Sequence, residues 1–589
     1  MFDNRAAGTN RVKPNKNTLR EHAPLPAGEI TAEEKSDMKQ NTQQPVDRYE
    51  GHVHWNDHMP ALSVRDDGGL EGVLADSHGF CASPACSVYQ DLARSSADHH
   101  ILIKKTRSLC PVCSSVIDAE IVEEGGNIWL KRTCPEHGDF RYLYWSDARM
   151  YHRFERYDAV GNGIANPQNP GRSPDSCPTA CGLCNNHHSQ TLLANIDLTN
   201  RCNLNCDFCF ANARACGFIY EPGFDEIVGM LQVLRDEKPV PAPAVQFSGG
   251  EPTMREDLAD IIRKAKAMGF PQVQIATNGV KLAKDPNLAQ ELQDAGLGTV
   301  YLHFDGVTPE TNPILAIHKK ALENLRKVGL GTVLVPTVIR GRNDHELGDI
   351  IRFAIENIAI VRGVNFQPIA FTGAASDEDL QKTRITIPDV LARIEEQMDG
   401  ILRKDDFYPV PCVLPFSDLA EAYTGRPQVR FTAHQHCGAA TYVFVQDDGV
   451  IPVNRMVDVE SFFESIEHMA ETLRKGGTIN KYKALLEGVR DMHNSVKKGE
   501  HGNTAEFWKI IGKTLISQNF DALRDFHMNA LFIGVMHFMD KYNYDIERVQ
   551  RCCIHYATPD GKLIPFCTYN SGPVYRQQVW NKFAKKPET

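Results

Sequence analysis

Short apolar runs alternate with amphipathic stretches between Leu192 and Ala374, and this alternation constrains the fold more than any other feature of the chain. Stretches such as 224–237 and 344–356 have the apolar spacing of helices. Because strands joined by crossover helices form parallel sheets, we expect an α/β fold, with a partial (β/α)6 barrel over residues 192–375. Chemistry in such a barrel sits at the carboxyl ends of the strands. The six expected strands are LLANIDLT, AVQFS, QVQIAT, TVYLHF, GTVLVPTVI and GVNFQPIAF.

Three cysteines follow the first of these strands in the segment CNLNCDFC: Cys202, Cys206 and Cys209. An iron–sulfur cluster normally takes four cysteines, so three thiolates leave one iron open. An open iron can chelate the amino and carboxylate groups of a small molecule. The spacing alone also allows a closed zinc or iron–sulfur site with a fourth ligand from elsewhere in the chain.

The second expected strand ends in Ser248, Gly249, Gly250, Glu251 and Pro252, about forty residues after the cysteines. Two glycines permit close approach of the backbone, and Glu251 offers a carboxylate to an ammonium group. A cysteine triplet and this motif in a repeating β/α pattern resemble the radical S-adenosylmethionine (SAM) superfamily.

The resemblance implies roles for individual residues. Cys202, Cys206 and Cys209 would hold a 4Fe-4S cluster that cleaves SAM reductively to a 5'-deoxyadenosyl radical. Phe208 occupies the aromatic position before the last cysteine, as in the superfamily. Side chains at the ends of the third and fourth strands would line the SAM pocket, although ordinary strand-to-loop turns would look the same in sequence. These four are Thr277, Asn278, His303 and Asp305.

A second triplet, Cys177, Cys181 and Cys184, has the same spacing in the segment CPTACGLC. No strand precedes it, and no aromatic residue stands before its last cysteine. We therefore assign the loop 177–191 to an auxiliary cluster rather than to SAM.

The late cysteines fit a simple count. Two auxiliary 4Fe-4S clusters, each closed by four thiolates, need eight, and the second triplet supplies three. Some of the others are alternatively buried apolar residues. The remaining five are Cys412, Cys437, Cys552, Cys553 and Cys567.

Two knuckles about twenty residues apart, CPVC and CPEHG, mark residues 105–160 as a metal ribbon resembling a zinc ribbon or rubredoxin. Its ligands would be Cys110, Cys113, Cys134 and His137. Strand-like stretches at Val116–Val122 and Asn127–Arg132 complete the pattern. Zinc and mononuclear iron both suit such ligands, and Cys81 and Cys86 are alternative ligands.

Other regions have clear patterns as well. Residues 1–75 are polar and punctuated by proline, which predicts a mostly disordered segment. Residues 376–589 have a mainly helical pattern, with helices expected at Pro388–Arg403, Ser461–Arg474 and Ala505–Phe526. The apolar segment Met528–Met539 is best interpreted as a buried core helix. The alternatives are that it lines a channel for long lipid chains or lies against a membrane surface.

Charge and targeting signals narrow the functional classes. A net charge of -11 supplies no basic field for nucleic acid, which we exclude as a partner. The first residues lack an apolar secretory core, and no apolar stretch approaches the roughly 20 residues of a spanning helix. We expect a cytoplasmic protein, with peripheral membrane contact as the one remaining membrane role.

The whole set of motifs beyond residue 105, including KRTCPEHGDF, FSGGEPTMREDL and CCIHYATPDGKLIPFCTYN, resembles the archaeal tetraether lipid synthase family. The resemblance implies that two unactivated terminal methyl carbons of isoprenoid glycerol ether lipids are coupled, giving macrocyclic archaeol or a tetraether lipid. It also implies two hydrogen abstractions, an auxiliary cluster that holds the first alkyl unit, and a low-potential electron donor such as ferredoxin. The alternative is a radical SAM maturase that acts on a peptide or a cofactor precursor.

Overall fold

The computed structural model divides the chain into two compact units, 1–84 and 85–589, and every described residue belongs to the second. The expected disordered segment 1–75 and the expected helix Ala505–Phe526 therefore lie outside the described residues, as do Cys81 and Cys86. The structure describes residues 101–169, 176–211, 213, 217–372, 380–446, 449–477, 483–484, 486–488, 490–491, 494–495 and 530–584.

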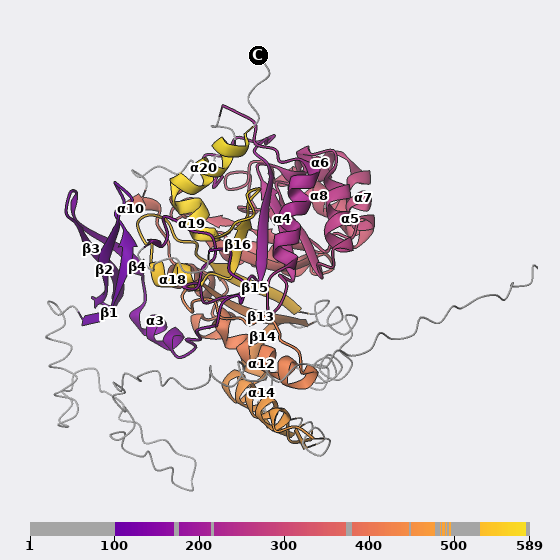
Figure 1. Cartoon of the computed structure of the whole chain (residues 1–589). Helices are drawn as coiled ribbons and strands as arrows, with labels where there is room; N and C mark the ends of the chain where they lie inside the picture. Colours follow the sequence, from indigo (N-terminus) through magenta and orange to yellow (C-terminus); the bar gives the residue numbers. More distant parts are fainter. Residues whose placement is uncertain are drawn as a thin grey trace, which may run out of the picture. The chain divides into compact units, whose positions relative to one another are not determined.

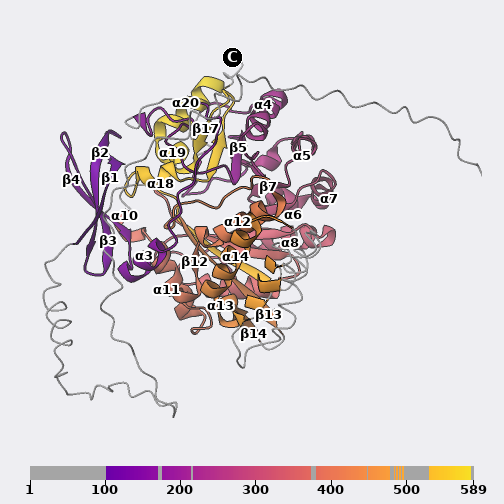
Figure 2. The ribbon, with the colours of Figure 1, turned by 60° about the horizontal axis from the view of Figure 1, so that its bottom comes forward.

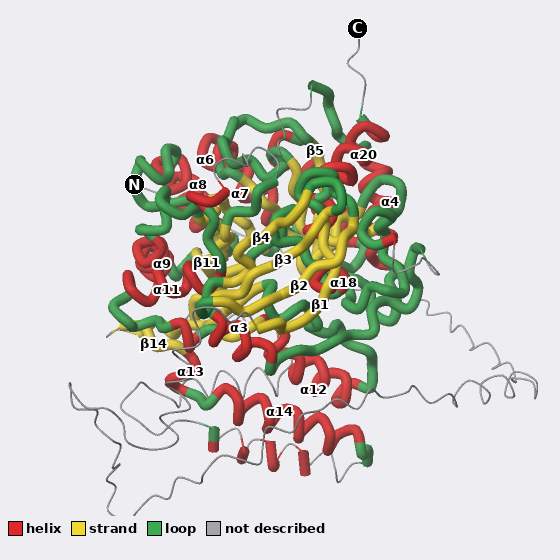
Figure 3. Tube along the Cα trace, turned by 90° about the vertical axis from the view of Figure 1, so that its left-hand side faces the viewer, coloured by secondary structure: helices red, strands yellow, loops and turns green. Residues whose placement is uncertain are grey.

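The ribbon is a four-stranded antiparallel sheet in the order β1-β2-β3-β4, and Figure 3 shows it with α3 (Ala148–Glu155) beside it. Gly125 and Gly126 form the turn between its second and third strands, with φ of 60° and 74°, which glycine adopts without strain. Asp147 begins α3 by accepting a hydrogen bond from the Met150 amide at 2.9 Å. The four strands are β1 (Ile101–Leu109), β2 (Val116–Glu124), β3 (Asn127–Cys134) and β4 (Gly138–Trp145).

Six parallel strands form the centre of the main sheet, where the sequence predicts them. The α/β fold class and the partial barrel are therefore confirmed. Pro336 interrupts the fifth predicted run, so it becomes β9 and the short β10 (Thr337–Val338), which pairs with β11. The six are β5 (Leu193–Thr199), β6 (Ala244–Gly249), β7 (Gln272–Thr277), β8 (Thr299–His303), β9 (Thr332–Val335) and β11 (Val361–Pro368).

Crossover helices bury their apolar faces on the outside of this sheet, and Figure 1 shows α4 to α8 gathered along one side of it. Ile227 and Leu231 of α4, for example, join the core formed by Val245 and Phe247 of β6. These helices are α4 (Phe224–Arg235), α5 (Leu258–Ala267), α6 (Val280–Lys284), α7 (Pro286–Asp294), α8 (Leu315–Val328) and α9 (Leu347–Glu356).

The C-terminal half extends both edges of the sheet, which the sequence did not predict. β15 (Ala530–Met536) pairs in parallel with β11, and β13 (Gly438–Gln446) pairs antiparallel with β15. At the other edge β16 (Ile554–Ala557) pairs in parallel with β5. The expectation of a core helix at Met528–Met539 is therefore wrong for its described part. Shorter strands complete the sheet of thirteen: β12 (Tyr408–Pro409), β14 (Gly449–Pro452) and β17 (Leu563–Pro565).

Helices accompany these strands, so the C-terminal region is mixed rather than mainly helical. Two of them, α11 (Ile387–Gln397) and α14 (Val459–Arg474), lie where the sequence predicts helices. Figure 2 shows α19 and α20 near β17 and β5. The others are α10 (Leu380–Thr383), α12 (Leu414–Thr424), α13 (Val453–Met456), α18 (Ile546–Gln550), α19 (Phe566–Ser571) and α20 (Pro573–Phe583).

The ribbon docks on the segment that leads into α18, and Asp545 is the centre of this contact. Its fully buried carboxylate accepts hydrogen bonds from Thr106 at 2.8 Å and from the Tyr144 hydroxyl at 3.0 Å, and it caps α18 through the Glu547 amide at 3.1 Å. Nearby, buried Arg132 donates to the carbonyl of Lys541 at 2.8 Å. Since α18 directly precedes Cys552, the ribbon fixes the approach to the late cysteines.

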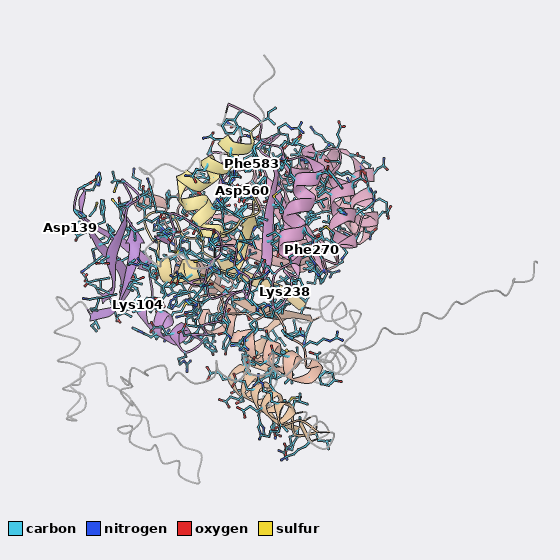
Figure 4. The ribbon with its side chains drawn as sticks, in the orientation of Figure 1. Lys104, Asp139, Lys238, Phe270, Asp560 and Phe583 are labelled. Carbon is cyan, nitrogen blue, oxygen red and sulfur yellow. The ribbon has the colours of Figure 1, made fainter. Side chains whose placement is uncertain are left out.

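Replacing Asp545 with Ala should lower the free energy of unfolding by about 2–4 kcal/mol, because the buried Tyr144 hydroxyl loses its acceptor and α18 loses its cap. Anaerobic thermal unfolding measures this. Glu547→Gln is the matched control, because it removes only the ion pair between Glu547 and Lys104 at the surface; Figure 4 labels Lys104. An exposed ion pair contributes about 0.5 kcal/mol, so the control should change the free energy of unfolding by about that amount. Equal effects of the two changes would contradict the docking role of Asp545.

Candidate active site and metal centres

The loop that carries Cys202, Cys206 and Cys209 begins at the carboxyl end of β5, where the sequence predicts it. Cys206 is exposed and the other two are half-buried. Burial, followed by the charges of Cys209 and Cys202, raises the pKa of Cys206 to about 11. A thiol with a raised pKa becomes a thiolate when a cationic cluster neutralises it, so a loop that carries three cysteines suits an iron–sulfur cluster.

Cys202 has two nitrogen donors near its sulfur. The Leu204 amide lies 3.5 Å from this sulfur, and the Asn278 side-chain amide lies 3.9 Å from it. The same Asn278 amide donates to Asn203 at 2.7 Å, which ties the cysteine loop to the end of β7. Hydrogen bonds to cluster sulfurs tune reduction potential, and Asn278 lies beside the sulfur of Cys202; its place in the SAM pocket stays a prediction.

Gly249 and Gly250 bring the end of β6 against the cysteine loop. A Cβ atom at Gly249 would lie 2.3 Å from the carbonyl oxygen of Thr199, and one at Gly250 would lie 2.3 Å from that of Arg201. The Gly250 amide donates to Thr199 at 2.6 Å, and the Glu251 amide donates to Arg201 at 2.8 Å. Both glycines are therefore needed for two backbones to meet.

The carboxylate of Glu251 lies beneath this contact and is 1% exposed. It accepts hydrogen bonds from the amide and hydroxyl of Thr253, the hydroxyl of Thr277 and the amide of Asn278, at 2.6 to 3.1 Å. Burial raises the pKa of Glu251, and these hydrogen bonds only partly offset the rise. Four donors fill the lone pairs of a carboxylate. Glu251 joins β6 to β7 here, and its contact with the SAM ammonium stays a prediction.

Phe208 anchors the other end of the cysteine loop. The guanidinium of Arg342 lies 5.0 Å from the Phe208 ring centre and 3.7 Å from the carboxylate of Asp207. Phe208 also packs against an apolar cluster that contains Phe371 and Tyr542. The loop is thus fixed from the β9 side of the barrel as well as from β6.

Polar side chains at the ends of β5, β6 and β8 face the same interior. His303 contacts Asp305 at 2.8 Å, and Asp305 accepts a hydrogen bond from the Thr337 amide at 2.8 Å. Burial lowers the pKa of His303, but Asp305 outweighs burial and the net shift is upward. Ser248 donates to Asp197 at 3.1 Å, and Pro252 is buried at the start of a short 3-10 turn.

The ribbon brings its four predicted ligands together. Their ligand atoms all lie within 4.8 Å of one another, with 3.9 Å between the Cys113 and Cys134 sulfurs and 3.5 Å between Cys134 and Nδ1 of His137. A tetrahedral zinc site places sulfurs about 3.8 Å apart and sulfur and nitrogen about 3.6 Å apart. Cys110 lies 3.8 Å from His137 Nδ1, so the geometry fits one tetrahedral metal with His137 as a ligand.

The auxiliary triplet forms a compact group of its own. Burial, followed by the charge of Cys184, raises the pKa of Cys177 to about 12. Burial also raises the pKa of Cys181, with Cys177, Cys184 and Cys552 adding to the rise. None of the fourteen cysteines in the described ranges forms a disulfide. The triplet therefore lies within electrostatic reach of a late cysteine.

Four of the late cysteines come within electrostatic reach of one another from both edges of the sheet: Cys437, Cys552, Cys553 and Cys567. Cys437 directly precedes β13 at one edge, whereas Cys552 and Cys553 directly precede β16 at the other. Burial raises the pKa of Cys567, and the charges of Cys552 and Cys437 add to the rise. Burial alone raises the pKa of Cys412 to about 12, without a contribution from another thiol. The division of these residues between two clusters stays a prediction.

A network of buried, hydrogen-bonded side chains lies beside Cys552, and the sequence analysis did not predict it. Thr191 donates to Glu237 at 2.7 Å and lies 2.7 Å from Nδ1 of His555. His555 contacts His187 at 3.0 Å, and His187 contacts the carbonyl of Cys552 at 2.7 Å. No local motif marks residues this far apart in sequence. This network of side chains holds the backbone of Cys552 in place from within the core.

Two family models match the chain: the radical SAM superfamily over residues 196–354, and the HMPTM N-terminal zinc ribbon domain over residues 102–146. The 7,8-dihydro-6-hydroxymethylpterin dimethyltransferase of Methanocaldococcus jannaschii is 48% identical over 492 residues, covering 82% of this chain and 96% of the relative. The probable GTP 3',8-cyclase of Methanothermobacter marburgensis is 28% identical, covering 37% and 71%. A methylornithine synthase structure is 14% identical, covers 36% of this chain and 64% of its own, and has a TM-score of 0.28. Among the described residues, no helix is long and apolar enough to cross a membrane.

Glu237 should make folding stability depend on pH. Burial raises the pKa of Glu237 to about 8, from the 4.5 of an exposed glutamate. Between these values the folded state binds more protons than the unfolded state, so stability falls as pH rises, by up to about 1.4 kcal/mol per pH unit. Anaerobic unfolding from pH 5.5 to 7.5 should show a steeper fall for the native chain than for Glu237→Gln. The exposed Glu256→Gln is the control, and parallel profiles for native and Glu237→Gln would contradict the raised pKa.

Mutation of one cysteine in each triplet should have different effects on SAM cleavage. Cys206→Ala should abolish formation of 5'-deoxyadenosine, whereas Cys181→Ala should lose iron and still cleave some SAM. The physical reason is position: only the loop of Cys206 meets the Gly249–Gly250 contact. Iron content and 5'-deoxyadenosine are measured by spectroscopy and mass spectrometry. An exchange of the two outcomes would overturn the assignment of the triplets.

Proposed function

This chain belongs to the radical SAM family that includes the pterin dimethyltransferase of Methanocaldococcus jannaschii, and from that premise we propose that it forms a carbon–carbon bond between unactivated alkyl carbons of isoprenoid ether lipids. Radical SAM chemistry is shared by the whole family. The lipid substrate is supported by the motif pattern beyond residue 105 and by one structural observation, an apolar wall on two neighbouring strands inside the barrel, β15 and β13.

The apolar wall lies on the inner face of the neighbouring strands β15 and β13. Because side chains alternate along a strand, residues that share a register position face the same way. Phe532, Met536, Ala440 and Tyr442 point inward and are half-buried, whereas Ile533, Val535 and Val443 point outward into the core. An unactivated methyl group offers no polar handle, so a surface of this kind suits its chain.

The residues around the loop of Cys202, Cys206 and Cys209 have distinct roles in the proposed reaction. When bound, a 4Fe-4S cluster on these cysteines supplies the electron that cleaves SAM. Gly249 and Gly250 let the backbone of β6 meet the start of the cysteine loop, and Asn278 orients the loop through Asn203. The cofactors of this proposal are SAM, the SAM cluster, two auxiliary 4Fe-4S clusters and a ribbon metal, zinc or iron.

The proposed reaction balances with two SAM molecules. Each 5'-deoxyadenosyl radical takes one hydrogen atom from one methyl group, so two C–H bonds break and one C–C bond forms. Each cleavage consumes one electron, which a low-potential donor such as ferredoxin would deliver. Peripheral contact with a membrane would give access to the lipid.

A second candidate is alkylation of a pterin, in line with a cofactor precursor as substrate. The name of the Methanocaldococcus jannaschii relative favours it. A further support is a ladder of side-chain amides on the inner face, where Gln274 donates to Gln246 at 2.9 Å and Gln246 donates to Asn195 at 2.8 Å. These amides hydrogen-bond one another.

Anaerobic incubation of the reconstituted chain with SAM and a strong reductant tests both candidates side by side. One reaction contains an archaeol-type diether lipid, and the other contains 7,8-dihydro-6-hydroxymethylpterin. We expect joined lipid chains that have lost two hydrogens per new bond, with two 5'-deoxyadenosine molecules per bond, by mass spectrometry. Conversion of the pterin with unchanged lipid would replace the lipid proposal by the second candidate. Cleavage of SAM with neither substrate changed would overturn both.

A further inference from the structure

Most of the buried arginines in this structure have a carboxylate as their partner. Six arginine side chains are buried among the described residues, and four of them form an ion pair. A buried charge without a partner is costly, so a folded chain normally supplies one. Arg132 and Arg548 form no ion pair with any described residue. The four pairs are Arg255 with Asp257, Arg384 with Asp540, Arg551 with Asp158, and Arg576 with Asp197.

Arg132 and Arg548 differ in their remaining contacts. Arg132 donates to two backbone carbonyls, those of Lys541 at 2.8 Å and Tyr542 at 3.2 Å. Arg548, on α18, donates through Nη2 to the carbonyl of His537 at 3.1 Å, and its buried Nε has no partner among the described residues. Four of the other five buried arginines also have an unpartnered Nε, so the missing carboxylate is the stronger observation. A buried cation with a free donor suits an anionic partner.

The hydrogen bond from Arg548 ends on a segment that contacts two predicted cluster ligands. The amide of His537 donates to the carbonyl of Cys437 at 3.0 Å, and the amide of Met539 lies 3.3 Å from the sulfur of Cys567. Arg548 is therefore fixed to the backbone that joins these two cysteines. Because its side chain belongs to a residue that is 2% exposed, its charge acts where the dielectric is low.

The groups around Arg548 favour its charged form. Burial by itself lowers the pKa of the guanidinium, but Tyr144, Cys437 and Cys567 outweigh burial, and the net shift is upward. Burial raises the pKa of Tyr144, so its side chain is a neutral phenol at neutral pH and donates to Asp545 at 3.0 Å. Of these three groups, the two cysteines are therefore the ones that can become anionic, and they do so when they bind a metal.

We infer that Arg548 is the buried counter-charge of an auxiliary 4Fe-4S cluster held by Cys437 and Cys567, and that it raises the reduction potential of this cluster. The inference rests on the auxiliary clusters of the proposed function and not on the lipid substrate. A 4Fe-4S cluster with thiolate ligands is anionic, and reduction by one electron adds a further negative charge. A fixed cation therefore stabilises the reduced cluster more than the oxidised cluster. Arg548 acts through the cluster and is a positioning residue.

An anaerobic redox titration of the full-length reconstituted protein tests this inference without turnover. The titration uses the Cys206→Ala background, in which the SAM cluster should be absent, so that electron paramagnetic resonance reports the auxiliary clusters. Dithionite supplies the electrons. Arg548→Gln removes the charge and should make reduction of one cluster about tenfold less favourable, a fall of about 59 mV in its midpoint potential for one electron. Arg548→Lys keeps the charge and should restore a nearly native potential.

Arg255→Gln is the matched control. It also removes the charge of one buried arginine, but from a pair with Asp257, and it should leave both auxiliary potentials unchanged. Iron content and thermal unfolding show whether each variant is folded and loaded. An equal fall in potential for Arg255→Gln and Arg548→Gln would overturn the inference, because the effect would then be general.

The remaining outcomes separate this inference from the proposed function. Unchanged potentials in iron-replete Arg548→Gln, or an equal fall in Arg548→Lys, would overturn the inference and leave the auxiliary clusters in place. If Arg548→Gln loses iron, retention of iron by Arg548→Lys would support the counter-charge, and loss by both would overturn it. Absence of any 4Fe-4S cluster from the Cys206→Ala protein would overturn the auxiliary clusters and the inference together. A shifted potential in a chain that leaves lipid unchanged would support the inference and overturn only the lipid proposal.

Discussion

The pairing of C-terminal strands with both edges of the six-stranded sheet is the constraint on which the rest of the structure depends. A six-stranded parallel sheet leaves two edges with unsatisfied amide and carbonyl groups. β15 covers the β11 edge and β16 covers the β5 edge. The pairing fixes the position of every late cysteine that adjoins these strands, because a register shift of one residue would turn inward side chains outward.

Electrostatics suits the auxiliary clusters of the proposal. Burial, followed by the charge of Cys184, raises the pKa of Cys177, and burial, with the charge of Cys437 adding to it, raises the pKa of Cys552, so each thiol would ionise more readily when a cationic cluster neutralises it. At the surface of the ribbon, by contrast, the pKa of one cysteine is lowered. The side chain and backbone of Ser115 lower the pKa of Cys113 to about 6, which prepares a thiolate for a metal at neutral pH. Under the proposal, cluster assembly in the core would couple metal binding to folding more strongly than metal binding in the ribbon does.

The sequence predicted the central sheet well because each strand there carries its own signal. Alternating strand and helix patterns, a cysteine triplet after β5 and glycines after β6 are local features. β15 was missed because a short apolar run containing Gly534 has no period that separates helix from strand. The network of buried, hydrogen-bonded side chains from Glu237 to His187 was not predicted, because its members are far apart in the sequence and meet only in the folded structure. Glu251 has a local motif, yet its four intramolecular donors are visible only once β6 and β7 are side by side.

The interior of the barrel is divided into two unlike halves, and this division links the fold to the chemistry. The half built by β5 to β8 carries the cysteine loop, Asp197 and His303, all of which suit a polar, charged cofactor. Beyond β11, whose inner face carries Asn365, the strands β15 and β13 carry Phe532 and Tyr442, which suit hydrocarbon. Radical abstraction from an unactivated carbon requires a radical source and an apolar chain to meet without water between them. β15 and β13 supply this apolar face, so the pairing that closes one edge of the sheet also supplies the surface on which the lipid proposal rests.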